Sequence, residues 1–506
     1  DVFRVFDPLN WVPNMQVAMD AVRSSNRICE AAICYTGDVL DPARPKYSLA
    51  YYVDLAKQLE KLGAHMLAVK DMAGLCKPFA AAKLVRALRE AIGIPIHFHT
   101  HDTSAASLAS ALEAAVAGAD IVDAAMAPLS GLTSQPNLNA IVEAARHTPL
   151  DTHLEPEPLR ALAHYWAGVR DHYTAFECGM KAPDADLYLH EMPGGQFTNL
   201  QEQARALGLS DRWEEICRAY ADVNQLLGDI VKVTPTSKAV GDLALLLVTN
   251  GMQAGELLTD SRDMAFPESV VDLLAGRMGQ PPGGFPPAVV KRIVRSGELV
   301  TGRPGASMPP ADFTAAEKKA TELLGRPASA QEVLSWLFYP RVFQDFAQHR
   351  AKHGDVSVLP TPAFLEGPKV GEELPVDIEP GKTLVIRLLS VGEPHADGTR
   401  TVFFELNGQP RSVSIADRSL EALVQRRPKA VVGDAREVGS PMPGLIVTVA
   451  VRAGDTISRG QKLLSLEAMK METTVYAERD GKIAEVLVSP GTPVEAGELV
   501  ARYADA

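Results

Sequence analysis

The sequence predicts a multidomain protein of mixed α/β and β structure that starts with part of a (β/α)8 barrel. Near the N-terminus, short β-rich runs alternate with amphipathic helical segments; a long helical region follows, and two similar glycine-containing segments lie near the C-terminus. Strands that alternate with helices are typical of βαβ units in a parallel sheet. The chain has 506 residues, enough for about three domains.

Five β-rich runs are expected to be neighbouring parallel strands of the barrel. They are VFRVFD (2–7), RICEAAICYTG (27–37), HMLAVKDMAG (65–74), PIHFHTHDTS (95–104) and ADIVDAAMAPLSG (119–131), with helical segments such as 47–64 and 107–119 between them. A complete barrel of this type has eight strands, so about three strands are expected to be missing upstream. Its active site lies at the carboxyl ends of the strands. The polar or large side chains at these ends are Asp7, Lys70, Asp71, His99, His101 and Met126.

Three further regions follow the barrel part, which is assigned to residues 1–150. Residues 151–353 are mainly helical by period, as in 157–173, 211–230 and 237–251. A break rich in proline and glycine leads into a β-rich region, 354–425, where Asn407-Gly408 between alternating apolar residues predicts a hairpin. A charged linker then opens the last region, 426–506.

Composition excludes several classes of protein. The formal net charge of −13 argues against general nucleic-acid binding, which needs a basic face. No apolar run approaches the roughly 18 residues of a membrane span, so no membrane association is expected. The five cysteines form no CxxC motif, which favours free thiols in a reducing compartment.

An internal repeat organises the last region. Residues 443–464 and 480–501 match at a fixed offset of 37, so that Gly444, Gly454 and Gly460 fall on Gly481, Gly491 and Gly497. Such a repeat indicates two copies of one small β unit, which must pair to bury an apolar face. Lys470, in EAMKM, lies between the copies at an expected hairpin tip. It is either an ordinary solvated lysine or the attachment point of a carrier group.

The EAMKM motif within this β repeat closely resembles the biotinyl carrier domain of biotin-dependent carboxylases. The resemblance implies a flattened β-barrel with biotin attached to Lys470, between Met469 and Met471. Lipoyl domains share the fold, but there the lysine typically follows an aspartate.

A second group of residues predicts a metal site in the barrel part. His97, His99 and His101 alternate along one run, which places them on one face of a strand. A His-x-His pair at a strand end suits a metal ion, although histidines satisfied by hydrogen bonds are an equal alternative. Lys70 could be a Schiff-base amine, a phosphate contact, a salt-bridge partner or a carbamate ligand. The spacing alone leaves these alternatives open.

Longer motifs extend the resemblance to the whole chain. FRVFDPLNWVPNM, VKDMAGLCKP, HFHTHDTS, HEMPGGQFTNL and VKVTPTSKAVGD, in this order, closely resemble the carboxyltransferase domain of the pyruvate carboxylase family, and RTVFFELNGQPR resembles that family's allosteric and tetramerisation region. The resemblance implies a TIM barrel with a helical extension, a small β-rich allosteric domain and the carrier domain. Ala105 departs from the family's usual glycine, with little consequence expected.

The resemblance also implies the site residues. Lys70, as a carbamate, with His99 and His101 would bind a divalent metal (Zn, Mn, Co or Mg), whereas His97 matches no ligand and is expected to support the site or the core. Thr234 would relay a proton between pyruvate and biotin, and Ser237 would line the biotin pocket. The family's aspartate ligand and its pyruvate-binding arginine and glutamine lie on strands that this sequence lacks, so the metal site is expected to be incomplete.

The implied reaction is carboxyl transfer from carboxybiotin to pyruvate, giving oxaloacetate. Expected partners are biotin protein ligase, a further carboxyltransferase domain in a dimer or tetramer, a biotin carboxylase domain elsewhere, and acetyl-CoA. Alternatives are an oxaloacetate decarboxylase α subunit, a transcarboxylase subunit, or a non-catalytic carrier and scaffold. A bacterial cytoplasm, or a mitochondrial matrix in a eukaryote, is the expected location.

Overall fold

The computed structural model describes residues 1–260, 262, 264–295, 297–395, 398–417, 428–431, 434–468 and 471–504, with only the backbone of Ala468, Met471 and Glu472. The chain divides into two compact units. The first comprises residues 1–170, 177–306 and 427–506, and the second comprises residues 171–176 and 307–426. The predicted domain boundaries at 150, 353 and 425 stay predictions.

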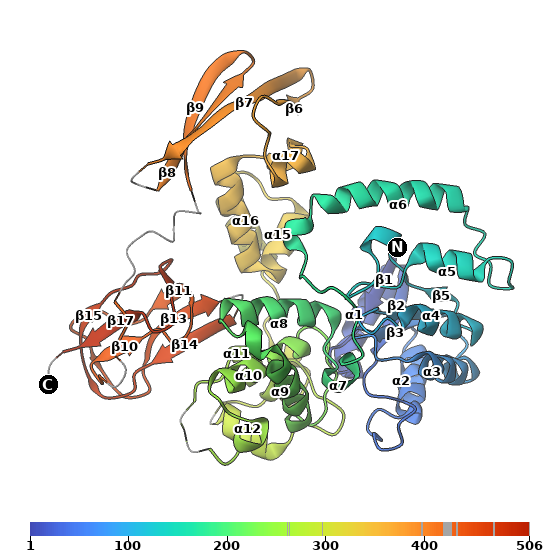
Figure 1. Ribbon diagram of the computed structural model, residues 1–506. Coiled ribbons are helices and arrows are strands. Elements are labelled where there is room, and N and C mark those ends of the chain that lie inside the picture. The colour runs from blue at the N-terminus through green and yellow to red at the C-terminus, as the bar shows by residue number, and fades with distance from the viewer. Residues whose placement is uncertain are drawn as a thin grey trace. The chain divides into compact units, whose positions relative to one another are not determined.

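The first unit begins with a parallel five-stranded sheet in the order β1-β2-β3-β4-β5 (Figure 1). Its strands are β1 (Val2–Val5), β2 (Ile28–Cys34), β3 (Met66–Asp71), β4 (Ile96–Thr100) and β5 (Ile121–Val122). All four neighbouring pairs are parallel, which confirms the predicted βαβ arrangement. The last strand is shorter than its predicted run because a 3-10 turn, η1 (Ala127–Leu129), occupies part of it.

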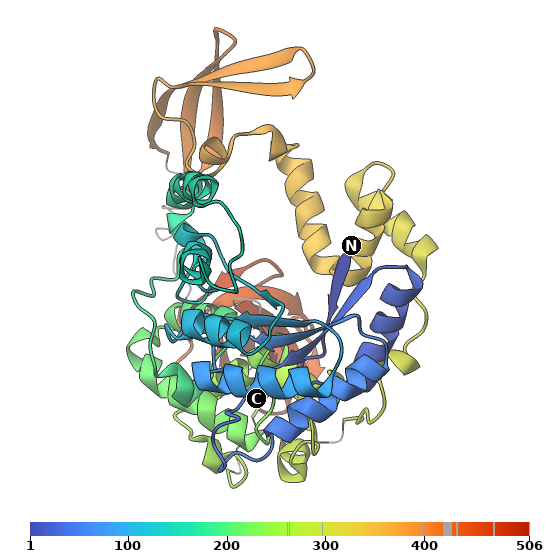
Figure 2. The ribbon, with the colours of Figure 1, turned by 90° about the vertical axis from the view of Figure 1, so that its right-hand side faces the viewer.

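Amphipathic helices follow these strands along the chain and cover the sheet. They are α1 (Val12–Ser24), α2 (Leu49–Lys61), α3 (Pro78–Ala91), α4 (Ser107–Val116) and α5 (Leu138–Ala145). Leu55 and Leu59 of α2, like Leu84 and Leu88 of α3, are spaced by four residues and therefore lie on one helix face. They pack with the strand residues into one core, and Figure 2 shows the blue helices along the blue strands.

A helical region with its own core follows, as predicted from its period. Its elements are α6 (Pro156–Asp171), α7 (Leu187–His190), α8 (Gly194–Ala206), η3 (Ser210–Arg212), α9 (Trp213–Leu226), α10 (Thr236–Thr249), η4 (Ala254–Glu256), α11 (Glu268–Leu274), α12 (Pro287–Val294) and α13 (Pro304–Ser307). The turn η2 (Thr174–Phe176), between α6 and α7, belongs to the second unit. Helix α10 is buried almost all round, and its Leu243 and Leu247 pack with Tyr220 of α9 and Leu200 of α8. This central helix carries at its N-terminus the segment that contains Thr234.

The second unit combines helices with an antiparallel sheet. The helices are α14 (Phe313–Leu324), α15 (Ala330–Phe338), α16 (Pro340–His353), η5 (Val356–Val358) and α17 (Thr361–Leu365); the strands, in sheet order, are β6 (Glu373–Glu379), β7 (Lys382–Pro394), β8 (Thr399–Leu406) and β9 (Gln409–Ala416). Asn407 and Gly408 both have positive φ, which confirms the predicted hairpin turn. Strand β6, which contains Pro375, was not predicted from the sequence. It lies at the edge of the sheet, where a proline is tolerated.

The C-terminal part of the first unit is a sandwich of two four-stranded sheets. One has the order β10-β17-β15-β12 and the other β14-β13-β11-β16. The strands are β10 (Glu437–Gly439), β11 (Gly444–Val449), β12 (Thr456–Ile457), β13 (Lys462–Ala468), β14 (Met471–Tyr476), β15 (Gly481–Val486), β16 (Pro493–Val494) and β17 (Leu499–Tyr503). Apolar side chains from both sheets fill the space between them.

The structure confirms the internal repeat strand by strand. Strands β11, β12 and β13 begin at positions 444, 456 and 462, and β15, β16 and β17 begin at 481, 493 and 499, each 37 residues later. A Cβ on Gly444 would lie 2.6 Å from the carbonyl oxygen of Glu467, and one on Gly481 would lie 2.9 Å from the ring of Tyr503. The repeated glycine therefore allows the same close strand crossing in both copies.

The described residues contain neither a disulfide bond nor a helix that could cross a membrane. All five cysteines are free thiols, as predicted, so no disulfide bond crosslinks the fold. Among the residues that the structure describes, no helix is both long and apolar enough to cross a membrane.

Candidate functional site

The structure brings Lys70, His99 and His101 together at the carboxyl ends of β3 and β4. Lys70 is directly opposite His99 in the parallel register of these strands. His101 follows β4, and its ring centroid lies 5.2 Å from that of His99. Strand alternation puts the two imidazoles on the same face of the sheet. The three predicted metal ligands thus form one group.

Both histidine rings are fixed in a way that suits metal binding. His99 Nδ1 lies 2.8 Å from a carboxylate oxygen of Asp123, and His101 Nδ1 lies 2.7 Å from the carbonyl oxygen of Thr133. Metal-binding histidines almost always donate one ring N–H to such a partner, which leaves the other nitrogen for the ion. Burial lowers the pKa of His101 to about 4, so the imidazole is neutral at pH 7, as a metal ligand must be.

Lys70 is partly buried beside an aromatic ring. Its Nζ lies 4.9 Å from the centroid of the Phe6 ring, and burial lowers the pKa of its amine. A lower pKa increases the fraction of neutral, nucleophilic amine at a given pH. Over the described part of the chain there is no cluster of three or more His, Cys, Asp or Glu residues that could hold a metal.

Asp71 organises the loop that follows β3. Its buried carboxylate accepts hydrogen bonds from the backbone N–H groups of Gly74, Leu75 and Cys76, at 2.9 to 3.0 Å, and from the hydroxyl of Thr100 at 2.8 Å. The bond to Thr100 ties this loop to the end of β4. Asp71 therefore holds the edge of the sheet that carries Lys70 and His99, rather than facing a substrate.

A charged network beneath the three ligands was not predicted from the sequence. Arg4 of β1 and His97 of β4 both bind the buried carboxylate of Glu30 in β2, with His97 Nδ1 2.6 Å from Glu30 Oε1. His97 Nε2 lies 2.8 Å from Asp123, which also holds His99. The prediction that His97 supports the site therefore agrees with its contacts. The available signal was an ionisable residue inside two otherwise apolar strand runs, VFRVF and ICEAAIC.

The network is stable as a set of ions. Burial alone would raise the pKa of Glu30, but hydrogen bonds from His97 and Arg4 outweigh it and lower the pKa to about 2. Burial alone would lower the pKa of His97, but hydrogen bonds to Asp123 and Glu30 raise it to about 9. The stability that Glu30 contributes is lost as pH falls through its pKa in the folded protein. The stability that His97 contributes is lost as pH rises through its pKa in the folded protein. The network therefore stabilises the fold most between about pH 4.5 and 6.5, the two unfolded values.

Replacing Glu30 is expected to destabilise the protein strongly. The substitution Glu30→Ala leaves Arg4 and His97 without their shared buried anion, and loss of one partner of a buried pair costs about 3–5 kcal/mol. Urea denaturation at pH 6 measures the change in free energy of unfolding. Glu143→Ala, which removes a surface pair with Arg146, is the control and should cost under about 1 kcal/mol. Equal losses in both variants would contradict this account of the network.

Thr234 lies on a short segment that is tied to the same end of the sheet. The Lys232 ammonium donates to the hydroxyl of Thr36 at 3.0 Å, and Thr36 comes two residues after the end of β2. The hydroxyl of Thr236 is within 2.8 Å of the carbonyl oxygen of Val231, which closes the turn. Thr234 itself is exposed. Ser237 is buried in the first turn of α10, and its place in a biotin pocket stays a prediction.

The predicted carrier residues are only partly within the described structure. Strand β13 ends at Ala468 and β14 begins at Met471, and these two residues pair across the antiparallel ladder. Met469 and Lys470 lie outside the described residues, and the side chain of Met471 is not described. The structure therefore has paired strands on both sides of Lys470. The role of the lysine stays a prediction.

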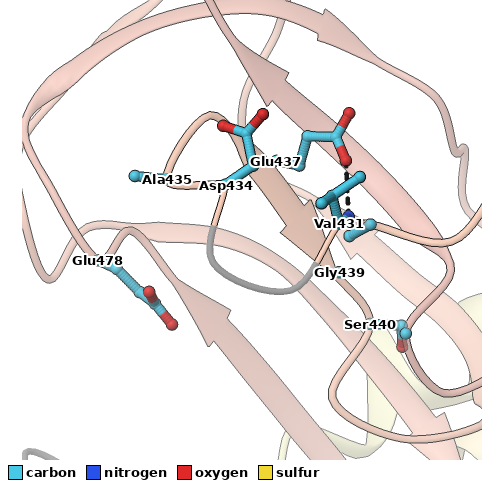
Figure 3. A pocket seen from close by; sticks show the side chains of 9 residues that line it. Val431, Asp434, Ala435, Glu437, Gly439, Ser440 and Glu478 are labelled. Atoms are coloured by element: carbon cyan, nitrogen blue, oxygen red, sulfur yellow. Dashed lines mark hydrogen bonds between the residues drawn. The ribbon is translucent and has the colours of Figure 1, made fainter.

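A pocket of about 400 Å³ in the C-terminal sandwich contains none of the predicted site residues. Figure 3 shows the carboxylates of Asp434, Glu437 and Glu478 around it. The N–H of Val431 donates to Glu437 at 2.8 Å, and Arg502 pairs with the same carboxylate at 3.0 Å. Asp434 pairs with Arg436. Two of these three carboxylates, those of Asp434 and Glu437, thus have hydrogen bonds or ion pairs within the protein. Nothing about the pocket points to a ligand.

Comparison with protein families divides the chain into three parts. Residues 20–165 match the HMGL-like family, residues 187–387 match a conserved carboxylase domain, and residues 436–502 match the domain of biotin-requiring enzymes. These matches agree with the observed sheet of βαβ units, the helical region and the C-terminal sandwich.

Individual relatives give the same result. The chain is 47% identical over 500 residues to pyruvate carboxylase of Bacillus subtilis, and 45% identical over 503 residues to the human mitochondrial enzyme. It covers 44% and 43% of their lengths, so it spans a little under half of these relatives.

Solved structures are similar as well. The complete multifunctional pyruvate carboxylase from Rhizobium etli is 53% identical with a TM-score of 0.78, over 99% of this chain and 46% of that one. The carboxyl transferase domain of the same protein, solved with pyruvate and biocytin, is 55% identical with a TM-score of 0.79, over 83% of this chain and 70% of that one. The chain therefore belongs to the pyruvate carboxylase family.

Proposed function

We propose that this chain carries out the carboxyl-transfer half of pyruvate carboxylation, moving a carboxyl group between biotin and pyruvate to give oxaloacetate. The observation that carries this proposal is the group formed by Lys70, His99 and His101 at one edge of the sheet. It occurs in a chain that is 55% identical to a carboxyl transferase domain solved with pyruvate and biocytin. A domain of the biotin-requiring type lies in the same chain and would supply the carrier.

Lys70, His99 and His101 would hold a divalent cation. The fixed Nδ1 atoms of both histidines and the partly desolvated lysine fit this role, with Lys70 as a carbamate, since a neutral amine reacts with CO₂. When bound, the cation supplies Lewis-acid polarisation of the substrate carbonyl. Zn, Mn, Co and Mg all accept such nitrogen and oxygen ligands. Asp123 would keep the His99 ring oriented.

Thr234 would move the proton. Its hydroxyl is exposed on a fixed turn, and Oγ1 would accept a proton from the methyl group of pyruvate while it passes its own to the ureido nitrogen of the carrier. The bond between the ureido nitrogen and the carboxyl group would break, and the methyl carbon, left with the electron pair of its C–H bond, would form the new carbon–carbon bond to the released CO₂. A positioned relay of this kind needs aligned donor and acceptor atoms rather than a pKa near neutrality.

Lys470 would carry the biotin, with Met469 and Met471 beside it and Ser237 near the ring in the pocket. Partners proposed from the family are a biotin protein ligase, a biotin carboxylase domain, further copies of the carboxyl transferase domain in a dimer or tetramer, and acetyl-CoA. A bacterial cytoplasm or a mitochondrial matrix would suit these partners.

The proposed function is tested by biotin-dependent turnover of oxaloacetate. In protein that also contains the barrel strands expected upstream and is co-expressed with a biotin ligase, intact mass should show one biotin, and oxaloacetate should be decarboxylated to pyruvate. Lys470→Arg should abolish both signals, whereas Lys482→Arg, an exposed lysine of β15, should change neither. Turnover by Lys470→Arg at the parent rate would overturn the carrier role. A biotinylated protein without oxaloacetate turnover would leave a carrier and scaffold as the function.

A further inference from the structure

The segment before Thr234 is anchored by a lysine that no proposed step uses. The side chain of Lys232 is only 2% exposed, and it cannot reach a substrate. Its ammonium donates to the hydroxyl of Thr36 at 3.0 Å, to the carbonyl oxygen of Ile230 at 3.3 Å and to Glu191 at 2.9 Å. The three N–H groups of a lysine are thereby all engaged. Lys232 thus joins the Thr234 segment directly to the end of β2.

Glu191 connects this lysine to a second point on the parallel-sheet region. Arg44, in the connection between β2 and α2, binds Glu191 and lies 3.3 Å from a carboxylate oxygen of Asp229. Burial alone would raise the pKa of Glu191, but the charge of Lys232 and the hydrogen bond from Arg44 lower it to about 2. The carboxylate therefore stays ionised and bridges two cations across the working pH range.

The same connection holds the turn just upstream of Lys232. The Lys46 ammonium donates to the carbonyl oxygen of Gly228 at 2.6 Å, and the Tyr47 hydroxyl donates to that of Asp229 at 2.9 Å. Gly228 and Asp229 both have positive φ, so the chain turns sharply at this point. These bonds fix where the segment of residues 230–234 starts, and the bonds of Lys232 fix where it passes β2.

We propose that Lys232, held by Glu191 and Arg44, is a positioning residue that sets Thr234 against the end of the parallel sheet. The inference rests on the proposed function, in which the Thr234 hydroxyl must lie in line with two reacting atoms. A shift of about 1 Å in such a group can cost about 100-fold in rate. A buried ionic network with all three lysine hydrogens used provides the required rigidity without touching the substrate.

The test compares turnover number with substrate affinity. Lys232→Met in the holoenzyme should lower kcat for oxaloacetate decarboxylation about 10- to 100-fold and leave KM within about twofold, because the metal ligands are unchanged. Arg212→Met is the matched control: it also removes a cation from an ion pair in the helical region, with Glu215 at 2.8 Å, and should leave both constants unchanged. An unchanged kcat in Lys232→Met, or an equal loss in the control, would overturn the proposal.

A second comparison separates positioning from general damage. If Lys232 acts through Thr234, the double variant Lys232→Met/Thr234→Ala should be no slower than Thr234→Ala alone. A multiplicative further loss would show a structural role and overturn the proposal. If Thr234→Ala itself has full activity, the proposed function fails first, so the two failures are distinguishable.

Thr36→Val covers the case in which Lys232→Met does not fold. It removes only the hydroxyl that accepts from Lys232 and leaves the ion pair with Glu191 intact. A kcat about tenfold lower with KM unchanged, in a variant that circular dichroism shows to be folded at the assay temperature, supports positioning, because loss of the bond lets the segment before Thr234 shift. An unchanged kcat in this folded variant contradicts it.

Discussion

Thr234→Ala is expected to lower kcat for biotin-dependent oxaloacetate turnover by about 10²- to 10⁴-fold, the range of a lost general acid–base group. The exposed hydroxyl is the group through which the methyl proton of pyruvate would leave, and alanine offers no exchangeable proton. Biotinylation of Lys470, measured by intact mass, should be unaffected because the carrier region folds as its own sandwich. The loss should therefore appear in kcat without loss of the carrier.

Two matched variants define this result. Thr234→Ser keeps the hydroxyl and should retain most of the turnover, and Thr249→Ala removes an exposed threonine at the other end of α10 without effect. A second readout is exchange of the methyl protons of pyruvate with deuterium, followed by NMR in the presence of the biotinylated protein. If Thr234→Ala still exchanges and turns over within a few-fold of the parent rate, another group moves the proton.

Local patterns in the sequence predicted most of the fold. The five strand runs, the helical period after residue 150 and the Asn407-Gly408 turn each depend on neighbouring residues, and all appear in the structure. The repeat was also visible because Gly444 and Gly481 meet the same steric demand in both copies. Strand β6 was missed because Pro375 usually marks a break, and only its place at the sheet edge makes the proline acceptable.

The site could be predicted only in part because its supporting contacts join distant residues. Alternation put His99 and His101 on one face. It could not show that Asp123 binds His99. Nor could it show that Glu30 binds the neighbouring His97. The ion pair between Lys232 and Glu191 spans 41 positions, and no local spacing reveals it. The role of Thr234 came from the family resemblance and not from the chemistry of a lone threonine. Pair contacts of this kind require the fold.

Loss of any one proposed metal ligand is expected to remove the bound cation. In protein that also contains the expected upstream strands, His101→Ala and Lys70→Ala each delete one of the three ligands proposed in this chain, so the cation measured by plasma mass spectrometry should fall below one tenth of the parent occupancy at equal free metal. Asp123→Asn should have the smaller effect of an outer partner, a 10- to 100-fold weaker affinity. His153→Ala, at an exposed position, is the control. Parent-level metal in His101→Ala would place the cation elsewhere.

Lys70 should bind the cation only as a carbamate, and this makes metal affinity depend on CO₂. The ammonium form is a cation and repels a metal, whereas reaction of the neutral amine with CO₂ gives an anionic oxygen donor and releases a proton. Because burial lowers the pKa of Lys70, this reaction is favoured over that of a solvated lysine. Metal affinity should therefore rise with added bicarbonate in the parent protein and not in Lys70→Arg, which keeps a positive charge but cannot form the carbamate. A carbamate carbon signal in ¹³C NMR with labelled bicarbonate, absent from Lys70→Arg, is the direct measurement. If the metal affinity of the parent protein does not change with bicarbonate, the neutral amine of Lys70 or another residue is the third ligand.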